Sequence, residues 1–360
     1  MKKKMLYTLI ALLLCFFLWL ARGLWVEAGS LPHGARRERC ESSPNWRDGS
    51  FRNERPTLQL TGSDGMGRTL WRFLFSRPSS LTPGAALPVV RHNLHDLDRS
   101  TEVCVWLGHS TLFVQTAGLR FLFDPVLSAR HLPISLFLHP FKGSDVYTVA
   151  DIPPVDYLVI THDHWDHLDY RTVRALQSRV SHVVCGLGVG AHFEYWGYPA
   201  EMIHELDWGE AYGPLRCLPS RHFSGRLLGR NQSLWASFLI DGPRRIFVSG
   251  DGGYDERFAR IGRQYPGIDL AVMENGQYND NWRYIHTLPH QLPTAIDELG
   301  ACRVLTYHNA KYALARHPWN EPLDSISLYA KDKEWRLLTP RIGEPVRMDD
   351  DGQVFTPWWH

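Results

Sequence analysis

The feature that most constrains this chain is a dense group of histidine and aspartate residues that directly follows a short apolar run. Residues 157–160 read Tyr-Leu-Val-Ile, which is typical of a buried strand, and residues 161–167 read Thr-His-Asp-His-Trp-Asp-His. A loop at the end of a strand can turn several side chains toward one point. Because imidazole and carboxylate groups together suit Zn²⁺ or a similar metal, this pattern predicts a metal site at the edge of a sheet.

Three later residues occupy the same kind of position, just past the end of an apolar run. They are His222, Asp251 and His308, which follow the predicted strands at residues 215–219, 246–249 and 304–307. Taken singly, each has another interpretation: His222 as a surface loop residue, Asp251 as part of an Asp-Gly turn, and His308 as a strand cap. Open α/β folds place their ligands at the carboxyl ends of strands. We therefore expect the three side chains to meet the histidine-rich loop.

The order of the predicted elements indicates an α/β fold. Early strands at residues 102–107, 111–116 and 119–123 are separated by short turns, the last of them Ala117-Gly118. Strands and helices then alternate. The remaining strands are predicted at residues 157–160, 215–219, 234–240, 246–249, 270–273 and 304–307, and the helices at residues 171–176, 191–196, 256–262 and 294–299. Hairpins followed by alternating strands and helices predict two sheets covered by outer helices, a four-layer α/β sandwich.

The amino terminus has the pattern of a membrane-directed segment. Lys2, Lys3 and Lys4 precede a nearly unbroken apolar run over residues 5–21, and a membrane-spanning helix needs about 20 such residues. We expect an anchor retained in the inner membrane, with the catalytic domain on the periplasmic side. The alternative is a signal peptide cleaved after residues 26–28, Val-Glu-Ala, which would leave a periplasmic or secreted protein.

Three parts are predicted: an anchor or signal at residues 1–28, a linker and irregular arm at residues 29–99, and a hydrolase domain at residues 100–360. The arm is rich in Pro, Gly, Ser and Arg, and we expect it to pack on the main domain through Trp71, Phe73 and Phe75. A net charge of +1 gives no reason to expect binding to nucleic acid. None of the six cysteines forms a Cys-x-x-Cys pair, which argues against a thiolate zinc site. The oligomeric state is left open, a dimer included.

The ligand pattern resembles the metallo-β-lactamase superfamily. Further stretches are similar to the branch that contains N-acylphosphatidylethanolamine-hydrolysing phospholipase D and its bacterial relatives. These stretches are Trp46-Arg47-Asp48-Gly49, residues 106–111, residues 123–126, residues 222–226, and residues 285–289 before His308. The resemblance extends from about residue 45 to residue 317. It implies the four-layer αββα fold of that superfamily and two zinc ions per chain.

Residue by residue, the resemblance implies two sets of ligands joined by Asp251. One metal would be bound by His162, His164 and His222, and the second by Asp166, His167 and His308, with Asp251 bridging. His109 and Asp124 match positions that support the ligands, although Asp124 equally fits an Asp-Pro turn. His286 matches a histidine near the substrate phosphate, and we take it with Asp166 as catalytic. Residues 307–311 differ from relatives that continue with Trp- or Phe-Gly, a change that bears on the substrate.

The first functional hypothesis is a membrane-associated zinc phosphodiesterase of the phospholipase D type, acting on (N-acyl)phosphatidylethanolamine or a related glycerophospholipid. Two adjacent metals can activate a water molecule for attack on phosphorus, with Asp166 orienting it and His286 or Arg226 neutralising phosphate oxygens. The apolar residues Leu132, Ile134, Leu136, Phe137, Leu138 and Phe141 form either a membrane-facing lip or a buried helix. Alternatives are a metal-dependent lactonase or esterase with a soluble substrate, and a non-catalytic metal-binding protein of the envelope.

Overall fold

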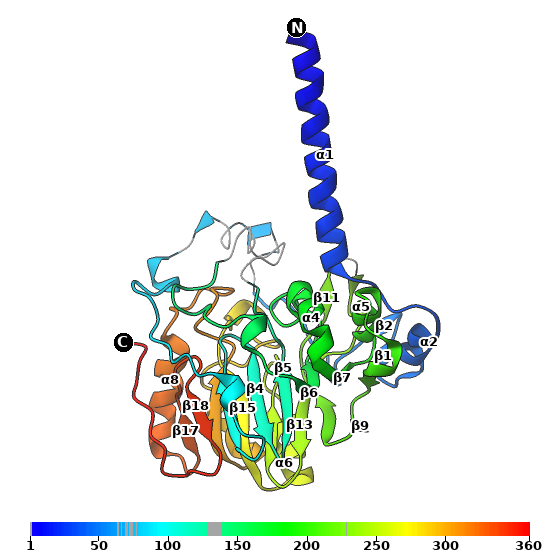
Figure 1. The fold of residues 1–360 in the computed structure, drawn as a ribbon. Helices are drawn as coiled ribbons and strands as arrows, with labels where there is room; N and C mark the ends of the chain where they lie inside the picture. Colours follow the sequence, from blue (N-terminus) through cyan, green and yellow to red (C-terminus); the bar gives the residue numbers. More distant parts are fainter. Residues whose placement is uncertain are drawn as a thin grey trace.

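Two large sheets pack face to face, with helices on their outer surfaces and one long helix projecting from the body (Figure 1). The computed structural model describes residues 2–62, 65, 67–68, 71, 75–76, 78–128, 139–227 and 229–360. The architecture is the four-layer αββα sandwich that the order of elements predicted, with the apolar helix at its amino terminus.

The first sheet has the strand order β18-β3-β4-β5-β6-β7-β8. Its strands are β3 (Val103–Trp106), β4 (Leu112–Thr116), β5 (Leu119–Phe123), β6 (Val155–Ile160), β7 (Val180–Gly186), β8 (Ile203–Leu206) and β18 (Pro345–Arg347). Pairing is antiparallel from β18 to β5 and parallel from β5 to β8. Ala117 and Gly118, with φ of 51° and 76°, form the predicted tight turn between β4 and β5. Helices α4 (Tyr170–Leu176) and α5 (Gly190–Tyr195) bury their apolar residues against this sheet.

The second sheet has the strand order β17-β16-β15-β14-β13-β10-β9. Its strands are β9 (Ala211–Tyr212), β10 (Leu215–Pro219), β13 (Ala236–Asp241), β14 (Arg245–Val248), β15 (Ile268–Glu274), β16 (Ala301–Tyr307) and β17 (Arg336–Leu338). Helices α6 (Arg257–Gln264) and α7 (Leu292–Leu299) cover its outer face, together with α8 (Glu321–Tyr329). The predicted strands and helices of both sheets are confirmed within one or two residues at most ends, while strands β7, β8, β9, β17 and β18 and helix α8 were not predicted.

The main core lies between the two sheets. Alternate residues of the strands face inward, so Trp106 and Phe121 of the first sheet pack with Phe238, Val248 and Tyr307 of the second. All five side chains are buried, and burying an aromatic or large aliphatic side chain contributes about 1.5–3 kcal/mol. This packing fixes the two sheets relative to each other and therefore fixes the loops at their common edge.

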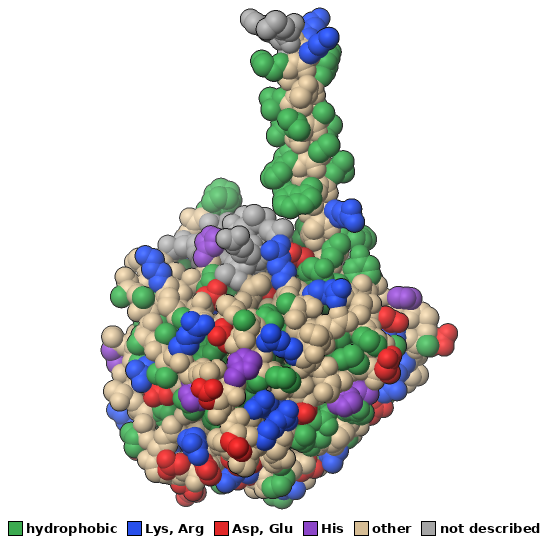
Figure 2. Space-filling model, in the orientation of Figure 1, with side chains coloured by type: hydrophobic (Ala, Val, Ile, Leu, Met, Phe, Trp, Pro, Cys, Tyr) green, Lys and Arg blue, Asp and Glu red, His purple; other side chains and the backbone are tan. Residues whose placement is uncertain are grey.

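Helix α1 (Lys2–Ala28) stands away from the sandwich (Figure 1). The helix runs for 26 residues from Lys3, and an 18-residue stretch of it has a mean hydropathy of 2.2, so it is long and apolar enough to cross a membrane, as a signal sequence also is. Apolar side chains lie along the face of the helix that is visible in Figure 2. The helix agrees with the predicted membrane-directed segment, and whether it is retained stays a prediction.

The arm after α1 packs on the sandwich differently from the prediction. Trp71 and Phe75 are 63% and 67% exposed, so they do not anchor it, and Phe73 lies outside the described residues. Cys40 of α2 (Gly34–Ser42) and Phe51 are instead buried against residues of the main domain. Their partners there are Leu187, Leu234 and Trp235. Short apolar patches of the arm thus supply the contact, and small side chains such as Cys40 give a weak sequence signal for it.

Two minor sheets and the cysteines complete the description. The two-stranded sheets are β1 (Trp46–Arg47) with β2 (Ser50–Phe51), and β11 (Gly225–Arg226) with β12 (Gly229–Arg230). All six cysteines are free thiols.

The predicted membrane-facing lip falls mostly outside the described residues. Those outside are Leu132, Ile134, Leu136, Phe137 and Leu138, whereas Phe141 is described and is buried.

Candidate metal centre

The predicted ligands come from loops at the carboxyl ends of strands in both sheets. The loop after β6 carries His162, His164, Asp166 and His167, while His222, Asp251 and His308 follow β10, β14 and β16. Because the inter-sheet core aligns these strand ends, the seven side chains converge at one edge of the sandwich, in groups whose donor atoms lie within 4.8 Å of one another. The structure therefore brings together all the residues that the sequence singled out as ligands.

Three histidines form the first group. His162 Nε2 lies 2.9 Å from His164 Nδ1, and His222 Nε2 lies 3.2 Å from the same atom. Nitrogen ligands about 2.0–2.1 Å from a tetrahedral zinc ion stand roughly 3.3 Å apart, a spacing close to that of these donors. The group thus has the size of three of the four ligand positions around a tetrahedral zinc ion.

Asp251 lies between this group and a second one. Its Oδ2 is 3.2 Å from His308 Nε2 and 3.3 Å from His167 Nε2. The same oxygen is 3.8 Å from His222 Nε2 and 4.0 Å from His162 Nε2. One carboxylate oxygen therefore faces donors of both predicted sets, which is the placement that a bridging ligand requires.

The second group contains Asp166, His167 and His308. Asp166 Oδ2 lies 3.4 Å from His308 Nε2 and 3.7 Å from His167 Nε2. The same oxygen accepts a 2.8 Å hydrogen bond from Nε2 of His109. His109 thus contacts a ligand in the way expected of a residue that orients it.

Hydrogen bonds also fix the orientation of the imidazole rings. His222 Nδ1 donates to the carbonyl oxygen of Ile285 at 2.7 Å, and His167 Nδ1 donates to Asp124 at 2.8 Å. Each bond occupies the Nδ1 proton, so Nε2 is the ring nitrogen that faces the site. Asp124 is itself fixed by Thr161, whose backbone N–H and hydroxyl donate to it at 2.8 and 2.7 Å.

The first group is prepared to bind a cation. Burial holds the pKa of His162 and His222 well below the usual value, and it lowers the pKa of His164 to about 4. The three rings are therefore neutral at pH 7, with lone pairs available. Neutral imidazole is the form that coordinates metals.

The carboxylates of the second group and its neighbourhood favour a positive charge between them. Burial alone lowers the pKa of His167, but Asp251, Asp166 and Asp124 overcome this effect and raise it well above the usual value. His167 Nε2, Asp251 Oδ1 and His308 Nδ1 are buried without a hydrogen-bond partner among the described residues. A buried polar atom without a partner is costly. The donor set therefore fits a divalent metal, which would satisfy His167 Nε2 and replace the proton on that ring.

Three residues of the site have a backbone conformation that non-glycine residues seldom adopt. The φ angles of His109, Asp124 and His308 are 49°, 42° and 65°. Such conformations cost about 1–3 kcal/mol each and persist only where the surrounding structure enforces them. The folded state is thus less stable than it would be with relaxed backbone at these residues, and the strained conformations direct the three side chains to the site.

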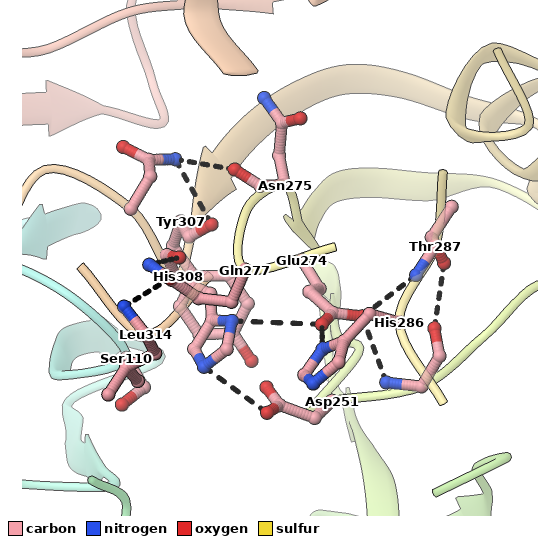
Figure 3. Close-up of polar contacts among 12 residues, drawn as sticks. Ser110, Asp251, Glu274, Asn275, Gln277, His286, Thr287, Tyr307, His308 and Leu314 are labelled. Atoms are coloured by element: carbon pink, nitrogen blue, oxygen red, sulfur yellow. Dashed lines mark hydrogen bonds and ion pairs between the residues drawn. The ribbon is translucent and has the colours of Figure 1, made fainter. Parts of the chain in front are cut away.

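Glu274 and His286 form an ion pair beside the second group (Figure 3). Glu274, the last residue of β15, contacts His286 Nδ1 through Oε1, and the same oxygen lies 3.7 Å from His308 Nδ1. Burial raises the pKa of Glu274; burial opposes charge on His286, but the attraction of Glu274 raises its pKa. The sequence prediction missed Glu274, although an acidic residue at a strand end is the same signal that pointed to Asp251.

A cavity of about 370 Å³ opens above these groups. Its polar lining consists of Gln59, His164, Asp166, His222, Arg230, Asp251, Gln277, His286 and His308, and its apolar lining of Leu60, Phe223, Trp282, Ile285 and Leu314. Arg230 is the one lysine or arginine among these lining residues, and its guanidinium lies 5.0 Å from the ring centroid of Phe223. The bottom of the cavity is therefore charged, and its walls are partly apolar.

The phosphate-binding role predicted for Arg226 does not fit the structure. Its guanidinium donates to the carbonyl oxygens of Asp163 and Leu168 at 2.9 and 2.8 Å, and to that of Glu27 at 2.7 Å. It also lies 3.8 Å from the ring centroid of Trp165. Arg226 therefore supports the histidine-rich loop from outside the cavity.

Comparison with known proteins agrees with this geometry. Residues 119–309, more than half of the chain, match the family model of the beta-lactamase superfamily domain. The chain therefore belongs to the metallo-β-lactamase superfamily and is a metal-dependent hydrolase by family.

Three individual proteins illustrate what this chain is similar to. An uncharacterised protein of Mycobacterium tuberculosis is 36% identical over 359 residues, covering 95% of this chain and 94% of the relative. The N-acyl-phosphatidylethanolamine-hydrolyzing phospholipase D 1 of Caenorhabditis elegans is 31% identical over 222 residues, covering 55% of this chain and 60% of the worm protein. CmlA, a diiron beta-hydroxylase from Streptomyces venezuelae, superposes with a TM-score of 0.53 at 21% identity, covering 69% of this chain and 54% of CmlA. The last similarity shows the fold alone.

Proposed function

We propose that this chain is a zinc-dependent phosphodiester hydrolase of the phospholipase D type, with two Zn²⁺ ions and a substrate such as N-acylphosphatidylethanolamine or a related glycerophospholipid. The observation that carries the proposal is Asp251, whose Oδ2 faces both ligand groups at the floor of a partly apolar cavity. Two adjacent metal sites of this kind are typical of hydrolases that cleave phosphate esters.

The proposed ligand sets follow the two groups. His162, His164 and His222 bind one ion, Asp166, His167 and His308 bind the other, and Asp251 contacts both. Imidazole and carboxylate ligands suit zinc. Bound zinc supplies Lewis acidity and a water molecule acidic enough to serve as nucleophile near neutral pH.

The side chains around the ions position the reactants. Asp166 lines the cavity and is fixed by His109, so it can orient the attacking water. His286 lines the wall and is fixed by Glu274, so it can donate to a phosphate oxygen. Fixed donors aimed at developing charge account for much of phosphoryl-transfer catalysis.

Arg230 supplies the remaining cation that a phosphate needs. It replaces Arg226 in this role because its side chain lines the cavity, whereas Arg226 donates to backbone carbonyls outside it. A guanidinium bound to a phosphate forms strong, charge-assisted hydrogen bonds. The apolar residues of the wall, among them Leu60 and Trp282, suit the glycerol or acyl part of a lipid.

The relatives support the substrate class and pose the question of the metal. The C. elegans relative is named for hydrolysis of N-acylphosphatidylethanolamine, and its similarity to this chain favours a phospholipid substrate. The diiron CmlA shows that the same fold can house iron. Metal identity is therefore part of the test.

The test is turnover of defined lipids by the full chain, purified in detergent with its metal content measured. Hydrolysis of N-acylphosphatidylethanolamine in water enriched in ¹⁸O is expected to give N-acylethanolamine and phosphatidic acid, with the label in the phosphate, because water attacks phosphorus. The variant His164→Ala serves as the inactive control. Turnover of lactones alone would replace the proposal with a lactonase, and stoichiometric metal without turnover of any lipid, lactone or phosphodiester would favour a non-catalytic envelope protein.

A further inference from the structure

The last turn of α1 is built into the body of the protein. Most of the helix is exposed, but Glu27 and Ala28 are only 4% and 0% exposed. The Glu27 carboxylate accepts a 2.9 Å hydrogen bond from Nε of Arg171 in α4. Residues 26–30, which we call the foot, therefore form part of the packed domain.

Two side chains of the domain bind the terminal carbonyl groups of α1. Trp196 Nε1 donates to the carbonyl oxygen of Val26 at 2.8 Å, and Arg226 donates to that of Glu27 at 2.7 Å. The last carbonyl groups of a helix have no partner within the helix, and a cation is favourable at that end. The contacts therefore cap the helix as well as attach it.

Gly29 lets the chain turn at the place where the helix ends. Its φ of 79° is a left-handed conformation, and a Cβ there would lie 2.2 Å from Nδ1 of His192. The next backbone N–H, that of Ser30, donates to the same nitrogen at 3.2 Å. Only glycine allows this close approach of the foot to His192.

The side chains that bind the foot also contact the histidine-rich loop after β6. Arg226 donates to the carbonyl oxygens of Asp163 and Leu168, and His192 Nε2 lies 3.4 Å from the carboxylate of Asp163. Asp163 stands between the proposed ligands His162 and His164. A single side chain thus separates the end of α1 from the loop that carries four of the proposed ligands.

The β11–β12 hairpin joins the foot to the mouth of the cavity. Arg226 on β11 contacts the foot, while Arg230 on β12 lines the cavity. Leu31, just after the foot, approaches Gly229 of the same hairpin. Leu227 at the hairpin tip is 55% exposed, so an apolar side chain is presented beside the anchor. Figure 1 shows α1 leaving the sandwich next to β11 and α4, at the end opposite α6.

We propose that α1 is a retained anchor and that its foot fixes it rigidly to the end of the sandwich that carries the histidine-rich loop. The tip of the β11–β12 hairpin and the mouth of the cavity are then held against the bilayer that contains α1. The partner of this surface is that bilayer. Cleavage after Ala28 would cut within the packed foot, which favours retention. If the proposed lipid hydrolysis holds, the substrate comes from the leaflet that faces the domain; the surface itself does not depend on that activity.

The test measures the depth of two labels on the full chain in vesicles of phosphatidylethanolamine and phosphatidylglycerol. A cysteine is introduced at Leu227 or, as control, at Gln264, an exposed residue at the end of α6 on the far side. The exposed native thiols are removed as Cys15→Ala and Cys302→Ser. An environment-sensitive fluorophore at position 227 is expected to be quenched several-fold more by lipid-borne nitroxide than the same fluorophore at position 264. Equal quenching at the two positions would overturn the proposal.

A second pair of variants tests the rigid attachment itself. Gly29→Ala places a methyl group against His192, whereas Gly34→Ala has a similar backbone, with φ of 53°, and meets no atom within 4 Å. Gly29→Ala is expected to abolish the contrast between positions 227 and 264 while α1 stays in the membrane, and Gly34→Ala is expected to keep it. Persistence of the contrast in Gly29→Ala, or an intact mass showing that the membrane-extracted chain begins after residue 28, would refute the rigid attachment. Hydrolysis is read separately, so its failure would not be confused with either result.

Discussion

Asp124 and His167 are joined by a 2.8 Å hydrogen bond between the carboxylate and Nδ1, and the opposite nitrogen of the same ring lies 3.3 Å from Asp251. The bond fixes both the tautomer and the direction of the ring. Asp124 is wholly buried and holds two further hydrogen bonds from Thr161. A residue buried away from solvent thus determines where a proposed ligand points.

We expect Asp124→Asn to lower metal affinity about 10- to 100-fold with little change in overall structure, because loss of an outer carboxylate weakens the ligand it orients. Competition with a chromogenic zinc chelator measures the effect. Asp156→Asn, at a more exposed site on β6 paired with Arg99, is the matched control. Wild-type affinity in Asp124→Asn would contradict the proposed support.

His164→Ala is expected to abolish hydrolysis and to remove stoichiometric metal while leaving the fold intact. His164 Nδ1 lies closest to the donors of the first group, and its side chain is not needed by the inter-sheet core. Elemental analysis and far-UV circular dichroism check the two halves of the expectation. Full activity in this variant would refute the ligand assignment.

Asp251 and His222 should differ in the number of metal ions that they control. Asp251→Asn is expected to lose both ions, since its Oδ2 faces donors of both groups. His222→Ala is expected to weaken chiefly one, because its Nε2 belongs to the first group alone. Titration of metal-free protein with zinc gives the two stoichiometries. Equal loss in the two variants would show that Asp251 does not bridge.

Arg230→Gln is expected to raise the KM for a phosphodiester about tenfold or more, since a charge-assisted hydrogen bond contributes about 1.5–3 kcal/mol. Arg230→Lys should recover part of the loss, because it restores the charge without the planar fork. Arg55→Gln, an exposed arginine paired with Glu256, is the control for general charge effects. A KM unchanged by Arg230→Gln would remove this residue from the substrate site.

The stability of the metal-free protein should depend on pH through its buried histidines. Burial lowers the pKa of His164 from 6.5 to about 4, so the unfolded chain binds more protons than the folded one between these values. Stability therefore falls as pH is lowered through this window. We expect the melting temperature to drop from pH 6.5 to pH 4, and to drop less in His164→Gln. Identical pH profiles for the two proteins would contradict the pKa shift.

The site was more predictable from sequence than its surroundings. Ligands such as His222 and His308 follow recognisable strands, and parallel strand ends meet at one edge, so local pattern and topology together placed them. Arg226 was predicted to bind phosphate and Arg230, which lines the cavity, was missed. Strands of two residues have no periodicity to show which side faces the cavity. The arm was predicted to pack on the main domain through aromatic residues such as Trp71, which are exposed in the structure. Its contact with the main domain instead depends on short apolar patches that include Cys40.

The proposed ligands are divided between the two halves of the sandwich, since the histidine-rich loop belongs to one sheet and His222, Asp251 and His308 belong to the other. Any ion bound there would cross-link the loops of the two sheets. Heat resistance and protease resistance should then rise with the concentration of free metal, and separation of the two halves would have to wait for the ions to dissociate.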